Sequence, residues 1–182
     1  MNILICYATT EGHTRRIAQA ITETANEAGH KATFIDATVV EDDEIDRHDA
    51  VIMAGSVHIG RYQSALVHRI STWLEKLKTK PNAFVSVSLA AASDDPDDLE
   101  GIEECAQKLF EQTGWTPDHV HHAAGAFRYT QYDFFKRWAM RFIAMQKGAS
   151  TDTSRDTEYT DWDALKRFTR EFLEFANHKL AA

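Results

Sequence analysis

Residues 3–14 read Ile-Leu-Ile-Cys-Tyr-Ala-Thr-Thr-Glu-Gly-His-Thr, which is an apolar run followed directly by a short polar loop. The apolar part, 3–8, has the length and continuity of a β-strand that is buried on both faces. Within 14–28 apolar residues recur at helical spacing, and Gly29 stands where a helix commonly ends. The stretch therefore predicts a strand, a tight loop and a helix in direct succession.

The same alternation continues along the chain. Apolar patterns predict further strands at 33–35, 50–55, 83–89 and 120–127, and helices within 66–77, 102–110 and 161–178. Strands that alternate with helices predict a parallel sheet with helices on both faces. We therefore predict an α/β fold: a flavodoxin-like three-layer sandwich whose five-stranded parallel sheet has the order 2-1-3-4-5.

The chain is expected to form a single domain over 1–182. Its 182 residues are 43% hydrophobic, which is enough for a proper core, and three prolines leave no evident linker. One segment interrupts the alternation of strands and helices. It covers 128–157, between the fifth strand and the last helix, where a loop of about 2–6 residues is usual. The sequence thus predicts a long insertion at the fifth strand.

Composition excludes several classes of protein. The 20 Lys and Arg against 28 Asp and Glu give a net charge of −8, which argues against a nucleic-acid partner. Cys6 and Cys105 lack metal-ligand spacing and fit a reduced, cytoplasmic protein. The histidines at 119, 121 and 122 begin a strand without a further ligand nearby, so we expect no metal. The first residues predict neither a signal peptide nor a membrane-spanning helix.

The loop after the first strand has the chemistry of a phosphate site. It opens a helix, whose first N–H groups are unsatisfied and lie at the positive end of the helix dipole. Three threonine hydroxyls add donors, and a glycine permits close backbone approach. The expected contacts are Thr9, Thr10, Glu11, Gly12, His13 and Thr14. A threonine-capped helix with no ligand is the alternative, while dinucleotide and nucleoside-triphosphate motifs are absent.

Two further loops lie at the same edge of the predicted sheet. Their small residues leave backbone N–H and C=O groups free, which suits a flat heteroaromatic ring. The residues concerned are Ser56, Val57, His58, Ile59 and Gly60 after the third strand, and Ser88, Leu89, Ala90 and Ala91 after the fourth. Together, the three loops indicate a site for flavin mononucleotide (FMN).

Several blocks carry a family resemblance that runs nearly end to end. They lie at 12–15, 60–65, 84–89, 115–118, 124–129, 151–153 and 159–162. The chain resembles the quinone-dependent protoporphyrinogen IX dehydrogenases, a bacterial family of the long-chain flavodoxin type. It departs from the pattern at Glu11, where threonine is common, at Ser88, where asparagine is expected, and in the acidic run 94–98.

The resemblance implies a function and further contacts. It implies FMN as cofactor, protoporphyrinogen IX as substrate in haem biosynthesis, and a membrane quinone, menaquinone or ubiquinone, as electron acceptor. It adds Ser86 and Gly125 to the expected cofactor contacts. The flavin carries the chemistry, so no catalytic side chain is assigned. The expected location is cytoplasmic, with peripheral contact at the inner membrane.

The insertion differs in charge from the rest of the chain. Within 128–147 five basic residues face one acidic residue, a net charge of +4, which leaves −12 on the remainder. Helical spacing places aromatic residues on one side and basic residues on the other, as in a helix lying at an interface. The alternatives are packing onto the sheet edge or a second subunit, and a substrate cleft over the flavin. The substrate contacts expected are Arg61, Arg128, Arg137, Trp138 and Arg141.

Two other functions stay open at this point. A flavodoxin-type electron carrier without a small-molecule substrate would use the acidic surface to attract basic redox partners. An FMN quinone or NAD(P)H reductase is a third possibility, and the missing dinucleotide motif disfavours it.

Overall fold

The computed structural model describes residues 1–127 and 157–182, so most of the predicted insertion, 128–156, lies outside the described residues. Five strands form one parallel sheet in the order β2-β1-β3-β4-β5. Their bounds are β1 Asn2–Ala8, β2 Lys31–Asp36, β3 Ala50–Ser56, β4 Asn82–Ser88 and β5 His119–Ala124. The predicted strand order is confirmed.

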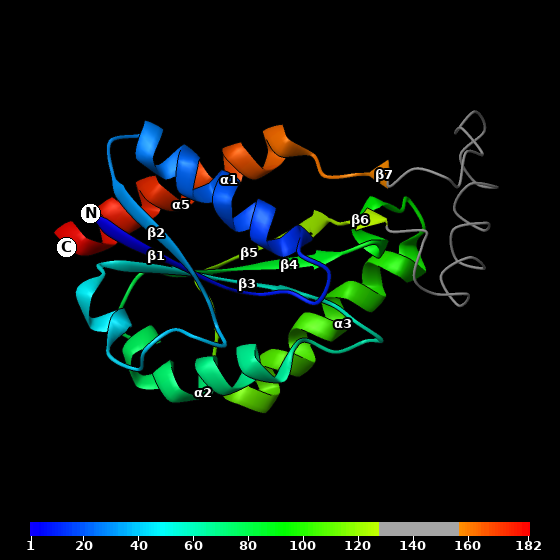
Figure 1. The fold of residues 1–182 in the computed structure, drawn as a ribbon, viewed down its shortest axis with the longest axis horizontal. Coiled ribbons are helices and arrows are strands. Elements are labelled where there is room, and N and C mark those ends of the chain that lie inside the picture. The colour runs from blue at the N-terminus through cyan, green and yellow to red at the C-terminus, as the bar shows by residue number, and fades with distance from the viewer. Residues whose placement is uncertain (128–156) are drawn as a thin grey trace.

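Helices cover both faces of this sheet, which gives the predicted three layers (Figure 1). Helices α1 (His13–Glu27) and α5 (Trp162–Ala181) lie on one face, and α2 (Ser64–Leu77) and α3 (Pro96–Thr113) lie on the other. Two short 3₁₀ helices, η1 (Glu44–Arg47) and η2 (Ala90–Ala92), follow β2 and β4.

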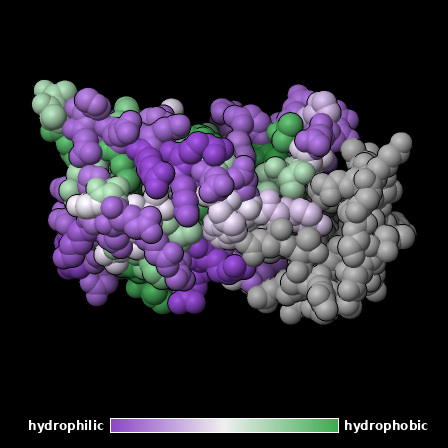
Figure 2. Space-filling model, turned by 90° about the horizontal axis from the view of Figure 1, so that it is seen from above, coloured by the Kyte–Doolittle hydropathy of each residue, from purple (hydrophilic) through white to green (hydrophobic). Residues whose placement is uncertain are grey.

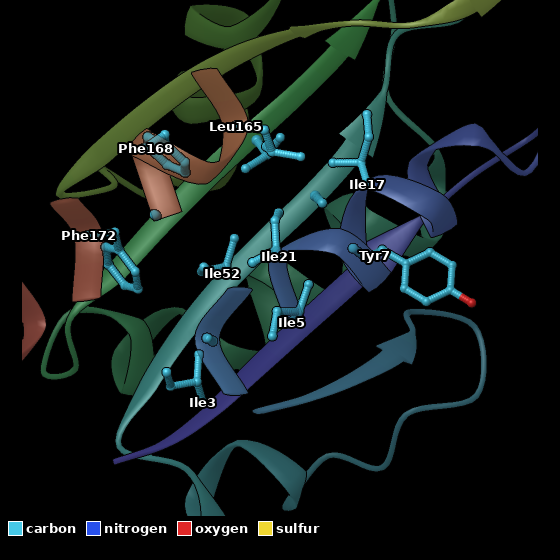
Figure 3. Packing of buried hydrophobic residues seen from close by; sticks show 14 of the residues in the cluster. Ile3, Ile5, Tyr7, Ile17, Ile21, Ile52, Leu165, Phe168 and Phe172 are labelled. Carbon is cyan, nitrogen blue, oxygen red and sulfur yellow. The ribbon is translucent and has the colours of Figure 1, made fainter. Parts of the chain in front are cut away.

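The central strands are buried on both sides because their successive side chains point into different cores. Along β1, Ile3 and Ile5 pack toward α1 and α5, whereas Leu4 and Cys6 pack toward α2 and α3. Figure 3 shows the first of these cores, with aliphatic side chains of β1, β3 and α1 meeting Leu165, Phe168 and Phe172 of α5. Each fully buried aliphatic side chain contributes about 1.5–3 kcal/mol, so the two cores stabilise the central strands of the sheet.

Helix ends follow local sequence signals. The carboxylate of Asp161 caps α5 by accepting a hydrogen bond from the backbone N–H of Ala164 at 2.8 Å. Asp95 caps α3 in the same way, ahead of Pro96 in the first turn. Gly29 has a φ of +84°, the left-handed conformation that commonly follows the end of a helix. The predicted helix stop at 29 is therefore confirmed.

The fifth strand differs from its prediction. A single strand was expected over 120–127, but β5 ends at Ala124, and 126–127 form β6 (Ala126–Phe127), which pairs antiparallel with β7 (Thr157–Glu158). The break falls at Gly125, whose N–H donates to the carbonyl of Ser88 at 2.9 Å while its own carbonyl accepts from Tyr159 N at 3.3 Å. The residues that flank 128–156 thus meet at the carboxyl edge of the sheet.

The surface over α1 and α5 is mainly hydrophilic, with scattered apolar residues (Figure 2). Among the helices of the described ranges, none combines the length and the apolar character needed to cross a bilayer.

Candidate functional site

A cavity of about 470 Å³ lies where the carboxyl ends of β1, β3, β4 and β5 converge. Most of the predicted cofactor contacts line it, and one residue that the sequence reasoning did not select, Val87, joins them. The lining consists of Thr9, Thr10, Glu11, His13, Thr14, Ser56, Val57, His58, Val87, Ser88, Leu89 and Gly125. The structure therefore brings the three predicted loops together around one space.

The remaining predicted contacts lie elsewhere. Ile59 and Ala90 line an adjoining cavity, whereas Gly60 and Arg61 lie in a groove beyond it. Ser86 is fully buried inside β4 and does not line the cofactor cavity.

Two predicted contacts, Gly12 and Ala91, do not line the cavity, and others fall outside the described residues. Gly12 and Ala91 shape the loops: Gly12 has a φ of +87°, and the N–H of Ala91 bonds to Ser88 Oγ at 3.2 Å. The positions predicted within the insertion, Arg128, Arg137, Trp138 and Arg141, lie outside the described residues.

Thr14 provides a direct indication of a ligand. Its side chain is fully buried in the first turn of α1 and lines the cavity, but its hydroxyl finds no hydrogen-bond partner in the described part of the chain. A buried hydroxyl left unpaired costs about 1–3 kcal/mol. The helix N-terminus beside it adds unsatisfied N–H groups and a positive dipole end. This position therefore suits an anionic acceptor such as a phosphate.

Gln63, the residue before α2, connects two of the loops. Its Nε2 donates to Thr10 Oγ1 at 3.0 Å and to Ser56 Oγ at 2.7 Å. Its Oε1 is buried and lacks a partner among the described residues. The sequence reasoning missed Gln63, because only the parallel topology brings the ends of β1 and β3 next to the start of α2.

The turn after β3 is tight and exposes an apolar side chain. His58 N donates to Arg61 O at 2.8 Å, and Arg61 N donates back to His58 O at 3.1 Å. Between them Ile59 and Gly60 both have positive φ, 50° and 69°. Such a conformation strains a β-branched residue by about 1–3 kcal/mol. Ile59 is nevertheless 80% exposed, so packing within the described chain does not account for the choice of isoleucine.

Ile59 faces a second, largely apolar cavity of about 840 Å³. This cavity shares Val57, Ser88 and Leu89 with the first, so the two spaces adjoin. Its other walls come from Ile59, Ala90 and the first half of α3, where Asp97 and Asp98 supply two carboxylates. Its mainly apolar walls and two carboxylates suit an apolar molecule with a few N–H donors.

Tyr62 lines the groove beyond the second cavity, and two contacts hold it in place. Tyr62 packs edge-on against Phe84 at 5.2 Å between ring centroids, and its hydroxyl bonds to Ser86 Oγ at 2.8 Å. Burial raises the pKa of Tyr62 well above its usual range, so the phenol stays neutral. Within β1, burial likewise raises the pKa of the Cys6 thiol to about 12, which keeps that cysteine unreactive.

The three histidines of β5 have structural partners. His121 stacks on Phe168 at 4.8 Å, His119 meets Phe175 edge-on at 4.6 Å, and His122 Nε2 lies 2.9 Å from a carboxylate oxygen of Glu103. Within residues 1–127 and 157–182, no group of three or more His, Cys, Asp or Glu side chains is arranged to hold a metal.

These features fit FMN. The loop at 9–14 offers a helix N-terminus and the unpaired Thr14 hydroxyl to a phosphate. The loops at 56–60 and 88–91 add the apolar side chains of Val57 and Leu89 to the walls of the cavity, which suits an aromatic ring. The backbone groups expected to be free there are in part already bonded, since the N–H groups of Val57 and His58 donate to the carbonyls of Val87 and Arg61.

Known proteins resemble this chain in sequence. The family model described as "Flavodoxin domain" matches residues 4–154. The Escherichia coli K12 protein named "Protoporphyrinogen IX dehydrogenase [quinone]" is 30% identical over 171 residues, 94% of either chain. A Leishmania major protein of the same name is 30% identical over 93% of this chain and 73% of its own.

Solved structures show the same fold. Oxidised flavodoxin 1 from Bacillus cereus superimposes with a TM-score of 0.57 at 13% identity, over 96% of this chain and 98% of its own. A flavodoxin from the domain Archaea gives 0.53 at 15% identity, over 98% and 100%. From the family match and the nearly full-length similarity, this chain belongs to the flavodoxin family, with the quinone-dependent protoporphyrinogen IX dehydrogenases among its relatives.

Proposed function

We propose that this protein is an FMN-dependent dehydrogenase that oxidises protoporphyrinogen IX to protoporphyrin IX in haem biosynthesis and passes the electrons to a membrane quinone. The proposal rests on one observation above all: relatives with that printed name match 94% of the chain at 30% identity. The apolar cavity that adjoins the FMN site supports it, since a substrate must reach the flavin.

The residues of the cofactor cavity bind and orient FMN. The N-terminus of α1 and the Thr14 hydroxyl would hold the phosphate, and the apolar side chains of Val57 and Leu89 would be available to the ring. Bound FMN accepts two electrons from a donor and releases them to an acceptor. The apolar walls keep water away from the reacting atoms.

The second cavity, which the substrate would occupy, must also accept protons. Conversion of a porphyrinogen to a porphyrin takes three two-electron steps, and each step removes a hydride equivalent from a bridging carbon together with one proton. Of the three protons, two leave pyrrole nitrogens and the third leaves the fourth bridging carbon. Asp97 and Asp98 line this cavity, where their carboxylates accept hydrogen bonds from pyrrole N–H groups and take up the released protons. The protein thereby supplies proton acceptors while the cofactor takes the electrons.

Membrane contact and self-association are further parts of the proposal. A membrane-dissolved quinone requires that this protein, otherwise cytoplasmic, approach the inner membrane surface, and the net charge of +4 within 128–147 suits anionic lipid headgroups. Aromatic residues in the same stretch also suit packing in a homo-oligomer. Co-sedimentation with liposomes of varied anionic content separates the two, because only lipid binding depends on headgroup charge.

Anaerobic flavin spectroscopy tests the main proposal. The purified yellow protein should be bleached by protoporphyrinogen IX and reoxidised by a water-soluble quinone analogue. A protein that holds FMN but reacts with neither would be an electron carrier, a role that the net charge of −8 favours through basic partners. Bleaching by NADPH alone would instead identify a reductase.

A further inference from the structure

A long groove lies between α2 and α3, on the side of the sheet opposite α1 and α5. It encloses about 1250 Å³ and begins at the turn after β3, where Gly60 and Arg61 form one end. From there it runs along α2 past Val67 and along α3 to Gln112. It lies beyond the residues that surround the FMN site.

Basic side chains line the groove, although the chain as a whole has a net charge of −8. Arg61 comes from the turn, His68 from α2 and Lys108 from α3, and all three are exposed. The side chains of Arg61 and His68 make no hydrogen bond or ion pair within residues 1–127 and 157–182, although Arg61 carries five N–H donors.

Lys108 is paired, but weakly. Its Nζ lies 3.0 Å from a carboxylate oxygen of Glu104, one turn earlier on α3, and both side chains are well exposed. Such a solvent-exposed pair contributes little, so a ligand carboxylate can replace Glu104. Glu103, the next acidic neighbour, is directed to His122 instead. The groove is therefore free to receive negative charge.

The groove connects to the cofactor through the apolar cavity. Cys105 of α3 lines both spaces, and its Sγ lies 3.7 Å from the carbonyl oxygen of Gly60 at the shared wall. The apolar cavity in turn shares Val57 and Leu89 with the FMN site. Three spaces thus follow one another: a phosphate and flavin site, an apolar cavity with two carboxylates, and a basic groove.

We propose that this groove binds the propionate carboxylates of the tetrapyrrole substrate, whose macrocycle occupies the apolar cavity. This inference rests on the proposed function and names the residues that recognise the substrate. Arg61 binds one carboxylate through its paired N–H groups, and Lys108 binds a carboxylate in place of Glu104. Quinones carry no carboxylate, so the groove distinguishes the electron donor from the acceptor.

Comparison of protoporphyrinogen IX with its dimethyl ester tests the proposal, because the ester lacks both negative charges. In the wild-type holoprotein the free acid should have the lower KM. Arg61→Gln and Lys108→Gln should each raise the KM for the acid about tenfold and leave the ester and quinone KM values unchanged. Lys108→Arg should retain the preference. Lys166→Gln, an exposed substitution on α5 across the sheet, is the matched control and should change nothing.

Equilibrium binding supplies a readout without turnover. Fluorescence titration with protoporphyrin IX and its dimethyl ester should show the same loss of discrimination in both glutamine variants, with FMN content unchanged. If the wild type binds acid and ester equally, or if the variants keep the preference, the groove proposal is overturned while the dehydrogenase proposal stands. A wild type that oxidises neither porphyrinogen overturns both.

Discussion

His13 Nε2 lies 2.7 Å from Thr160 Oγ1, although the two residues are 147 positions apart. The Thr160 hydroxyl donates its single hydrogen to the carbonyl of Ala124 at 2.7 Å. His13 Nε2 must therefore carry a proton and donate to Thr160, which fixes the tautomer of a neutral ring. The phosphate loop is in this way tied to the end of β5 and to the start of α5.

Thr160→Val should weaken FMN binding through this connection. The variant keeps the side-chain shape but leaves the Ala124 carbonyl without this donor and the His13 ring without this acceptor. A lost hydrogen bond of this kind costs about 1 kcal/mol, so the Kd of the apoprotein for FMN should rise about fivefold. Fluorescence quenching of FMN measures it.

The matched control for this variant is Thr169→Val. That hydroxyl is buried in α5 and bonds only within the helix, to the Leu165 carbonyl at 2.8 Å. The control should lower the melting temperature without changing the Kd for FMN. An equal Kd in Thr160→Val and the wild type would show that the connection does not order the loop.

Thr14→Val should have opposite effects on stability and on cofactor binding. In the apoprotein the Thr14 hydroxyl is buried without a partner in the described chain, so its removal should leave the melting temperature unchanged or raise it. A hydrogen bond to a charged phosphate is worth about 1.5–3 kcal/mol, so the Kd for FMN should rise at least tenfold.

Thr22→Val on the same helix controls for this change. Its hydroxyl already donates to the Ala18 carbonyl at 2.8 Å, away from the cavity. We expect the control to retain full FMN affinity. Unchanged affinity in Thr14→Val would place the phosphate elsewhere.

Gly12→Ala should destabilise the protein by backbone strain alone. Gly12 has a φ of +87°, and a Cβ built there would meet nothing within 4 Å. The left-handed conformation costs an alanine about 1–2 kcal/mol relative to glycine. Urea unfolding of the apoprotein should show this loss.

Gly101→Ala is the control: a Cβ there would also meet nothing within 4 Å, but the residue lies inside α3, so the substitution should instead stabilise the protein by about 0.5–1 kcal/mol. Equal effects at the two glycines would contradict the strain argument.

The elements that sequence predicted well are those in which a local pattern and burial coincide. The continuous apolar runs at 3–8 and 50–55 became β1 and β3, because strands buried on both faces need no alternation. The loop at 9–14 could be predicted as a phosphate site because a strand, a loop with threonine hydroxyls and a glycine, and the start of a helix follow one another directly.

What escaped prediction depends on contacts between distant segments. β5 ends before Gly125, where backbone bonds to Ser88 and Tyr159 take up the N–H and carbonyl of the glycine. Within the described residues, Gln63 is connected to the site by its hydrogen bonds to Thr10 and Ser56. For Ser86, by contrast, a local pattern was sufficient. Side chains alternate between the two faces of a strand, so Ser86 lies on the same face of β4 as Phe84 and bonds to Tyr62 there.

His121→Phe should make the protein less sensitive to acid. Burial lowers the pKa of His121, with a smaller lowering from His122 and opposing effects of Asp161 and Glu171. The folded protein therefore binds this proton less readily than the unfolded chain, whose histidine has a pKa of about 6.5. It follows that the free energy of unfolding falls as the pH drops below about 6.5.

Phenylalanine keeps the stacking on Phe168 and removes the titration, so the difference in urea midpoint between pH 7.5 and pH 5.5 should shrink. His30, whose pKa burial also lowers, remains in both proteins and cancels in the comparison. An identical acid-induced drop in both would show that His121 does not contribute to it.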